Sequence, residues 1–129
     1  MLFVCIGNSC RSQMAEGFAR AYGDDILIAK SAGLSPASIV QPLTRQMLAE
    51  RNIRIDDQFP KGIENFAREQ FDVIINMSGE KLPLALAGPV RDWPVRDPIG
   101  ETEAIYKAVA EQIEGLVMRL ILELRSSTL

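Results

Sequence analysis

Short apolar runs alternate along this chain with stretches in which apolar residues recur every three or four positions. A run of about four to eight apolar residues between turn residues is typical of a buried strand, whereas the wider spacing is typical of a helix packed on one side. The runs predict strands at residues 2–6, 26–33 and 71–77. They also predict a short edge strand within 89–95, because Pro94 cannot donate a hydrogen bond to a central ladder.

The helical spacing recurs between these runs. It predicts helices at residues 12–23, 43–51, 63–69 and 101–124. The last of these is the longest, and its apolar stripe consists of Ile105, Val109, Ile113, Leu116, Leu120 and Leu124. The final residues, 125–129, are expected to form a frayed tail.

Strands that alternate with helices are typical of a parallel sheet covered by helices on both faces. The chain has 129 residues, which is the size of one domain with a core of its own. Apolar residues make up 47% of the chain and charged residues 24%, as in ordinary globular proteins, so disorder is not expected. The sequence therefore predicts a single three-layer α/β domain over residues 1–129.

The composition limits which binding partners and which kinds of catalysis are expected. The net charge of −3 argues against nucleic acid as the main partner, and no apolar run is long enough to span a bilayer or to direct secretion. We therefore expect a cytoplasmic protein without a membrane partner. The absence of histidine removes His-based catalysis and His-type zinc sites, and two cysteines are too few for a zinc cluster. We expect no metal and no cofactor.

The residues CIGNSCRS, at positions 5–12, interrupt the first apolar run. They stand where a strand turns into a helix, and the loop amides and free helical N–H groups at such a turn favour a tetrahedral oxyanion. Arg11 adds a planar donor fork. The positive potential favours the thiolate of Cys5, a candidate nucleophile, and Ser12 can donate a hydrogen bond to that sulfur. The alternative is that Cys5 is a small buried hydrophobe, but the location of the loop favours the nucleophile.

On these residues the chain resembles the low-molecular-weight protein tyrosine phosphatases and their relatives, the thioredoxin-coupled arsenate reductases. The similar segments span nearly the whole chain and are FVCIGNSCRSQMAEGF at 3–18, SAG at 31–33, IENF at 63–66, FDVII at 71–75 and DWPVRDPIG at 92–100. The resemblance implies a four-stranded parallel sheet with flanking helices.

The resemblance also implies a role for each residue of the site. Cys5 is the nucleophile, Arg11 clamps the oxyanion and Asn8 holds the loop geometry. The oxyanion-binding residues are Ile6, Gly7, Asn8, Ser9, Cys10 and Arg11. Asp97 is the general acid, which agrees with the residues alone because a chain without histidine needs another proton donor. Asp92 is the second candidate for that role.

The two branches of the superfamily differ in how the bond to Cys5 is resolved. Phosphatases use water, whereas the reductases use further cysteines. Gln13 stands where phosphatases usually carry proline, which favours the reductases. Ser78, however, stands about where the first resolving cysteine would be, so a thiol relay through that loop is excluded. Cys10 is either a redox partner that forms a protective disulfide with Cys5 or simply part of the loop.

We therefore expect a Cys-dependent phosphatase that hydrolyses phosphate monoesters, such as phosphotyrosine or an aryl phosphate, through a cysteinyl-phosphate intermediate. The alternative is an arsenate reductase that takes a thiol from glutathione, mycothiol or a glutaredoxin- or thioredoxin-type partner. A third reading is an oxyanion-binding regulatory protein. In each case the ligand is phosphate, arsenate or a similar oxyanion, free or carried on a small molecule or protein. The tyrosine phosphatases wall their cleft with aromatic rings, and the matching residues here, 34–40 and 99–100, include none.

Overall fold

The computed structural model describes residues 1–83 and 86–127. Four parallel strands form one sheet in the order β2-β1-β3-β4. The strands are β1 (Leu2–Cys5), β2 (Lys30–Gly33), β3 (Ile74–Asn76) and β4 (Val90–Asp92). The expected α/β class and parallel sheet are confirmed, and β4 is an edge strand, as predicted from the nearby Pro94.

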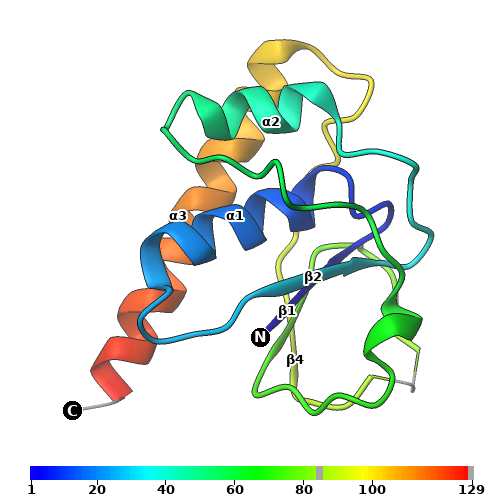
Figure 1. Ribbon diagram of the computed structural model, residues 1–129, viewed down its shortest axis with the longest axis vertical. Helices are drawn as coiled ribbons and strands as arrows, with labels where there is room; N and C mark the ends of the chain where they lie inside the picture. The colour runs from blue at the N-terminus through cyan, green and yellow to red at the C-terminus, as the bar shows by residue number, and fades with distance from the viewer. Residues whose placement is uncertain (84–85, 128–129) are drawn as a thin grey trace.

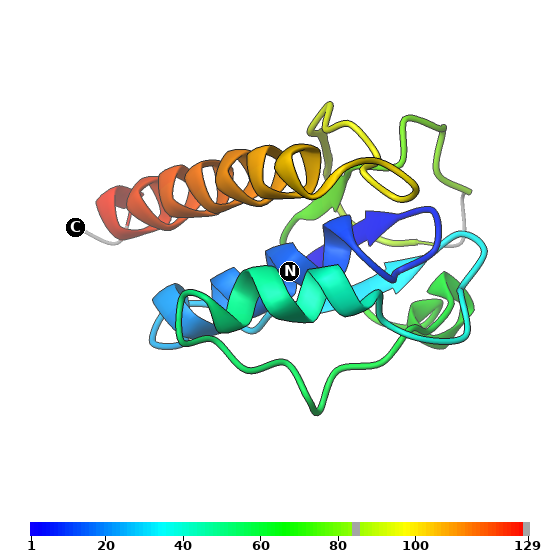
Figure 2. The same cartoon turned by 90° about the horizontal axis from the view of Figure 1, so that it is seen from above.

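The helices lie mainly on one side of this sheet (Figure 1). They are α1 (Arg11–Gly23), α2 (Pro42–Ala49) and α3 (Glu103–Ser127). Helix α1 packs directly on β1 and β2, and both α2 and α3 pack on α1 (Figure 2). The opposite face carries the short 3-10 helix η1 (Ile63–Phe66) and its flanking loops. The expected layers are therefore present, although the second one is thin.

Alternation along β1 divides its side chains between two apolar clusters. Phe3 and Cys5 belong to the large cluster beneath the helices, whereas Leu2 and Val4 belong to the smaller one beneath η1. Trp93 packs on Phe3 with ring centroids 6.0 Å apart, so the one tryptophan supports the core. Because both faces of β1 are covered, its end is held rigidly, and the site begins there.

Several element boundaries differ from the predicted ones because apolar runs continue beyond the ladder. Residues 26–29 are not part of β2, since the amides of Ile26 and Leu27 bond to the carbonyl of Gly23 and close the end of α1. Only residues 74–76 of the run at 71–77 pair as a strand. The helix expected at 63–69 is a single 3-10 turn that ends at Phe66.

The prediction of a frayed tail at 125–129 is wrong for residues 125–127, which continue α3. The guanidinium of Arg125 bonds both carboxylate oxygens of Asp25, at 2.7 and 3.1 Å, and this pair joins the last turn of α3 to the end of α1. Residues 128 and 129 lie outside the described part. None of the helices in the described ranges combines the length and the apolar character that a bilayer crossing requires.

Candidate active site

The loop at residues 6–10 connects the end of β1 to the start of α1. Three of its carbonyl groups are turned outward, toward the segment that follows β2. The carbonyl of Ile6 accepts from Ser35 N–H, and that of Gly7 accepts from Ala37 N–H, at 2.8 and 2.9 Å. The carbonyl of Ser9 accepts from Gln41 N–H at 3.0 Å.

These outward carbonyls determine where the loop amides point. In a trans peptide the C=O of one residue and the N–H of the next point in opposite directions. The N–H groups of Gly7, Asn8 and Cys10 therefore face inward. Among the described residues no side chain caps the start of α1, so its first amides are also available. The loop is a concave set of donors, which is suited to a tetrahedral oxyanion.

Asn8 holds the loop in its curved shape. Its φ angle of 50° lies in the left-handed region, which asparagine tolerates better than most residues. Its Oδ1 accepts from the Lys61 backbone amide, and its Nδ2 donates to Ser31 Oγ, each at 3.0 Å. Gly33 lets the loop come this close, because a Cβ there would lie 2.9 Å from the Asn8 nitrogen.

Cys5 lies at the floor of the loop and is 2% exposed. Its Sγ is 2.8 Å from Ser12 Oγ. Ser12 Oγ also accepts a hydrogen bond from Asn8 Nδ2 at 2.7 Å, which leaves the Ser12 proton free to point at the sulfur. The expected contact between Ser12 and Cys5 is therefore present, and Ser12 Oγ keeps a proton that it can donate to a Cys5 thiolate.

Arg11 joins the loop to two other segments. Its Nη1 donates to the carbonyl of Met77, just after β3, at 2.6 Å and to that of Val95, after β4, at 3.1 Å. With Nη1 occupied by protein carbonyls, Nε and Nη2 remain for a ligand. The side chain is 7% exposed, so its charge is concentrated at the mouth of the loop.

Of the two acids considered from the sequence, Asp97 lies beside Arg11. Its Oδ2 is 3.8 Å from Arg11 Nη2, and its Oδ1 accepts from the backbone amide of Ile99 at 3.0 Å. The Asp97 side chain is 48% exposed, so it can reach an incoming ligand. Asp92 instead accepts from Asn76 Nδ2 at 3.2 Å within the sheet. The geometry thus favours Asp97 for proton transfer.

Cys10 is buried against the loop with 1% of its surface exposed. Burial raises the pKa of its thiol to about 12, while a hydrogen bond with Thr44 acts in the opposite direction. Burial also raises the pKa of Tyr106, which shares a hydrogen bond with Cys10, to about 12. Cys10 is therefore a protonated thiol at neutral pH. Neither Thr44 nor Tyr106 could be predicted as a neighbour of Cys10, because both lie on helices distant from it in the chain.

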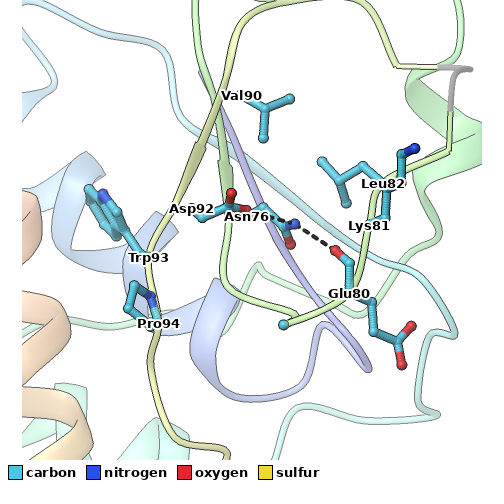
Figure 3. A pocket seen from close by; sticks show the side chains of 9 residues that line it. Asn76, Glu80, Lys81, Leu82, Val90, Asp92, Trp93 and Pro94 are labelled. Carbon is cyan, nitrogen blue, oxygen red and sulfur yellow. Dashed lines mark hydrogen bonds between the residues drawn. The ribbon is translucent and has the colours of Figure 1, made fainter.

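Ser78 closes a tight turn after β3. Its Oγ donates to Asn76 Oδ1 at 2.6 Å and accepts from the Glu80 amide at 3.0 Å. Asn76 Nδ2 donates in turn to the carbonyl of Glu80, at 2.8 Å (Figure 3). A cavity of about 640 Å³ opens beside this turn, between Leu82 and Trp93. Ser78 thus has a structural role in the turn.

A buried charged group stands behind Asn8. Glu16 is 2% exposed, accepts from Ser31 Oγ, and pairs with Arg20 at 2.9 Å. The Lys61 ammonium lies 4.0 Å from Glu16 Oε1 and donates to the carbonyl of Phe59. Burial lowers the pKa of Lys61, and the charge of Glu16 partly offsets this. The Glu16 carboxylate holds the Ser31 hydroxyl through a hydrogen bond. Ser31 Oγ in turn accepts from Asn8 Nδ2 and so helps to hold Asn8.

Comparisons with known proteins find relatives of similar sequence over nearly the whole chain. Residues 1–128 match the family described as low molecular weight phosphotyrosine protein phosphatase. A protein named glutaredoxin arsenate reductase, from a Synechocystis strain, is 37% identical over 125 residues, which cover 94% of this chain and 95% of that protein.

Solved structures of similar proteins superimpose on nearly the whole chain. An arsenate reductase in a phosphate-binding state superimposes with a TM-score of 0.83 at 36% identity, over 95% of this chain and 96% of that one. A low molecular weight protein tyrosine phosphatase from T. tengcongensis superimposes with a TM-score of 0.79 at 27% identity, over 95% and 97% of the two chains.

Proposed function

Because the chain belongs to the low molecular weight phosphotyrosine protein phosphatase family, we propose that it acts on a tetrahedral oxyanion through Cys5, and that it reduces arsenate with thiols supplied from outside the chain. The observation that carries the proposal is an intact oxyanion loop in a chain whose relatives of similar length are named arsenate reductases. These relatives favour the reductase over the phosphatase that the sequence had suggested first.

The proposed reaction begins with arsenate in the loop, bound by inward amides and the free edge of Arg11. The Cys5 thiolate attacks arsenic, and one arsenate oxygen leaves as water after Asp97 supplies a proton. An external thiol then attacks the Cys5 sulfur. The sulfur–arsenic electron pair stays on arsenic, which leaves as arsenite, and a mixed disulfide remains. A second external thiol reduces that disulfide, so two thiols supply the two electrons.

The need for an external thiol follows from the cysteine inventory. The chain has only Cys5 and Cys10, and Cys10 is a buried, protonated thiol. Ser78 is held in its turn by hydrogen bonds and carries no sulfur. The name of the Synechocystis relative suggests a glutaredoxin-type donor, and glutathione and mycothiol are the small-molecule candidates.

Hydrolysis of phosphate monoesters is the second candidate. It is supported by the family itself and by the likeness to a tyrosine phosphatase structure. Against a preference for aryl phosphates, the residue after Asp97-Pro98 is Ile99, an aliphatic side chain that is 43% exposed. Gln13 also favours the reductase, since its side chain makes three hydrogen bonds that proline could not make.

A paired assay separates the candidates. It measures arsenite formation with reduced glutathione plus glutaredoxin, with mycothiol and with thioredoxin, and phosphate release from an aryl phosphate. Arsenite formed with at least one donor, and lost in Cys5→Ala, supports the reductase. Phosphate release without arsenite supports the phosphatase. Binding of phosphate without either turnover identifies a regulatory oxyanion-binding protein.

Replacement of Asp97 by asparagine is expected to lower kcat by roughly 10²-fold or more, because the amide keeps the shape of the carboxyl group but cannot protonate a leaving oxygen. The measurement is the initial rate with arsenate, or with an alkyl phosphate if hydrolysis is the activity. Asp92→Asn is the matched control and should change the rate little, since Asp92 contacts Asn76. Equal rates in the two variants would assign the proton to another group.

Peroxide is expected to convert the Cys5 thiolate to a sulfenic acid. The Cys10 thiolate then attacks the sulfenic sulfur, the hydroxyl group leaves as water, and a Cys5–Cys10 disulfide forms. Because the pKa of Cys10 is about 12, this step should accelerate about tenfold per pH unit between pH 7 and 10. Mass spectrometry of quenched samples measures the disulfide. In Cys10→Ser, Cys5 should pass to the irreversible sulfinic acid. Recovery of this variant by reductant, equal to that of wild type, would exclude Cys10 as the protecting residue.

A further inference from the structure

Gln58 lies outside the oxyanion loop, in the connection between α2 and η1, and is 6% exposed. Its side-chain amide does not contact the loop directly. Instead, Nε2 donates to Gln13 Oε1 at 2.7 Å and to the Gln13 carbonyl at 3.1 Å. A glutamine that donates twice to the same neighbour fixes the orientation of that neighbour's amide.

The orientation of the Gln13 amide matters because three acceptors surround its nitrogen. Gln13 Nε2 donates to Asn8 O at 2.9 Å, to Asn8 Oδ1 at 3.0 Å and to Phe59 O at 3.0 Å. A flipped amide would place Oε1 against these three oxygens and lose all three hydrogen bonds. The donor on Gln58 adds to these three acceptors, because a flipped Gln13 amide would also turn its nitrogen toward Gln58 Nε2.

The series of hydrogen bonds continues from Asn8 through Ser12 to the Cys5 sulfur. With Oδ1 accepting from Gln13, the Asn8 nitrogen faces Ser12 Oγ, and the Ser12 proton is left for Cys5. The Gln13 amide shares the orientation of Asn8 with the Lys61 backbone amide, which also donates to Asn8 Oδ1. The series runs from Gln58 through Gln13, Asn8 and Ser12 to Cys5.

We propose that Gln58 is a positioning residue that sets the orientation of the Gln13 amide and thereby the hydrogen-bond direction at Asn8, Ser12 and Cys5. The inference rests on the proposed function only in that the Cys5 loop binds an oxyanion. It adds to the proposed function a need for Gln58, a residue that has no hydrogen bond to the oxyanion loop.

Two nearly isosteric substitutions test it. Gln58→Met keeps the volume of the side chain but has no N–H donor. The Gln13 amide therefore loses a hydrogen bond that orients it, and no charged group is introduced beside it. Gln58→Glu presents a carboxylate to Gln13 Oε1 and attracts Gln13 Nε2 away from Asn8. We expect Gln58→Glu to raise the dissociation constant of inorganic phosphate about tenfold or more, and Gln58→Met to raise it less. The rate of Cys5 alkylation by iodoacetamide should fall in the same order. Gln46→Glu adds the same charge at an exposed glutamine and is the matched control.

The outcomes distinguish this inference from its premise. If wild-type protein does not bind phosphate, the proposed function fails. If it does, and both Gln58 variants only lower the melting temperature while phosphate binding is unchanged, Gln58 is merely structural and the inference is overturned. An equal or larger effect of Gln58→Met than of Gln58→Glu also overturns it.

A double-mutant cycle covers the case in which Gln58→Glu does not fold. Since Gln58 is proposed to act through Gln13, Gln58→Met should weaken phosphate binding in the wild-type background and have little further effect in Gln13→Met. Additive effects of the two substitutions would show that Gln58 acts by another route, and the proposal would be abandoned.

Discussion

Replacement of Cys5 by alanine is expected to lower kcat by at least about 10⁴-fold for arsenate reduction or for phosphate release. The Cys5 sulfur is at the floor of the loop, and burial raises the pKa of the one other thiol in the sequence, that of Cys10, to about 12, so Cys10 is a poor substitute nucleophile. A solvent nucleophile would have to occupy the space that the sulfur leaves. Single-turnover assays at high enzyme concentration measure the residual rate.

The same variant should still bind inorganic phosphate with an affinity within about tenfold of wild type, because the loop amides and Arg11 supply the donors. Titration calorimetry measures this binding. Cys10→Ala is the control and should retain most of the turnover. Substantial turnover by Cys5→Ala would mean that the chemistry occurs elsewhere in the molecule.

The substitution Arg11→Lys is expected to lower kcat/KM by about 10³-fold. The guanidinium has two tasks, since Nη1 bonds the carbonyls of Met77 and Val95 while its other edge faces the ligand. A lysine ammonium can act as a point charge for the oxyanion or bond these carbonyls, but it cannot do both in one geometry. The phosphate dissociation constant should therefore rise by roughly 10²-fold together with the loss of rate.

The control for charge and size is Arg91→Lys, a surface arginine that pairs with Glu123 at 2.7 Å. It should leave both rate and phosphate binding near wild type, because exposed ion pairs contribute little. Kinetics over a range of substrate concentrations, with circular dichroism to verify the fold, measure the effect. Full activity in Arg11→Lys would show that one positive charge, without a fork, is sufficient.

The fold and the centre of the site could be predicted because both depend on local patterns. The apolar runs that become β1 and β3 are short and bounded by polar residues, and the Cys-x5-Arg-Ser spacing lies within one turn. The end of the last helix was predicted wrongly because it depends on a distant partner. Residues 125–127 remain helical beside Asp25, which is 100 residues from Arg125. No local pattern contains that pair.

The supporting residues of the site were missed for the same reason. Gln58 and Gln13 are 45 residues apart, and a lone glutamine in a loop has no pattern that distinguishes it. The fate of the Cys5 bond was also hard to predict. A serine at position 78 excludes only the internal thiol route, so water and an external thiol both remain, and the named relatives favour the latter.

The contacts of Arg11 also bear on how the protein becomes active as it is made. The loop that carries Cys5 is synthesised before the segments that anchor Arg11, because Met77 and Val95 are 66 and 84 residues further along the chain. At a synthesis rate of about 5–20 residues per second, the arginine lacks both anchors for several seconds. Contacts of such long sequence separation form late in folding. A nascent chain therefore carries the proposed nucleophile before its proposed arginine clamp is anchored, and we expect Cys5 to become reactive only after β3 and β4 have folded.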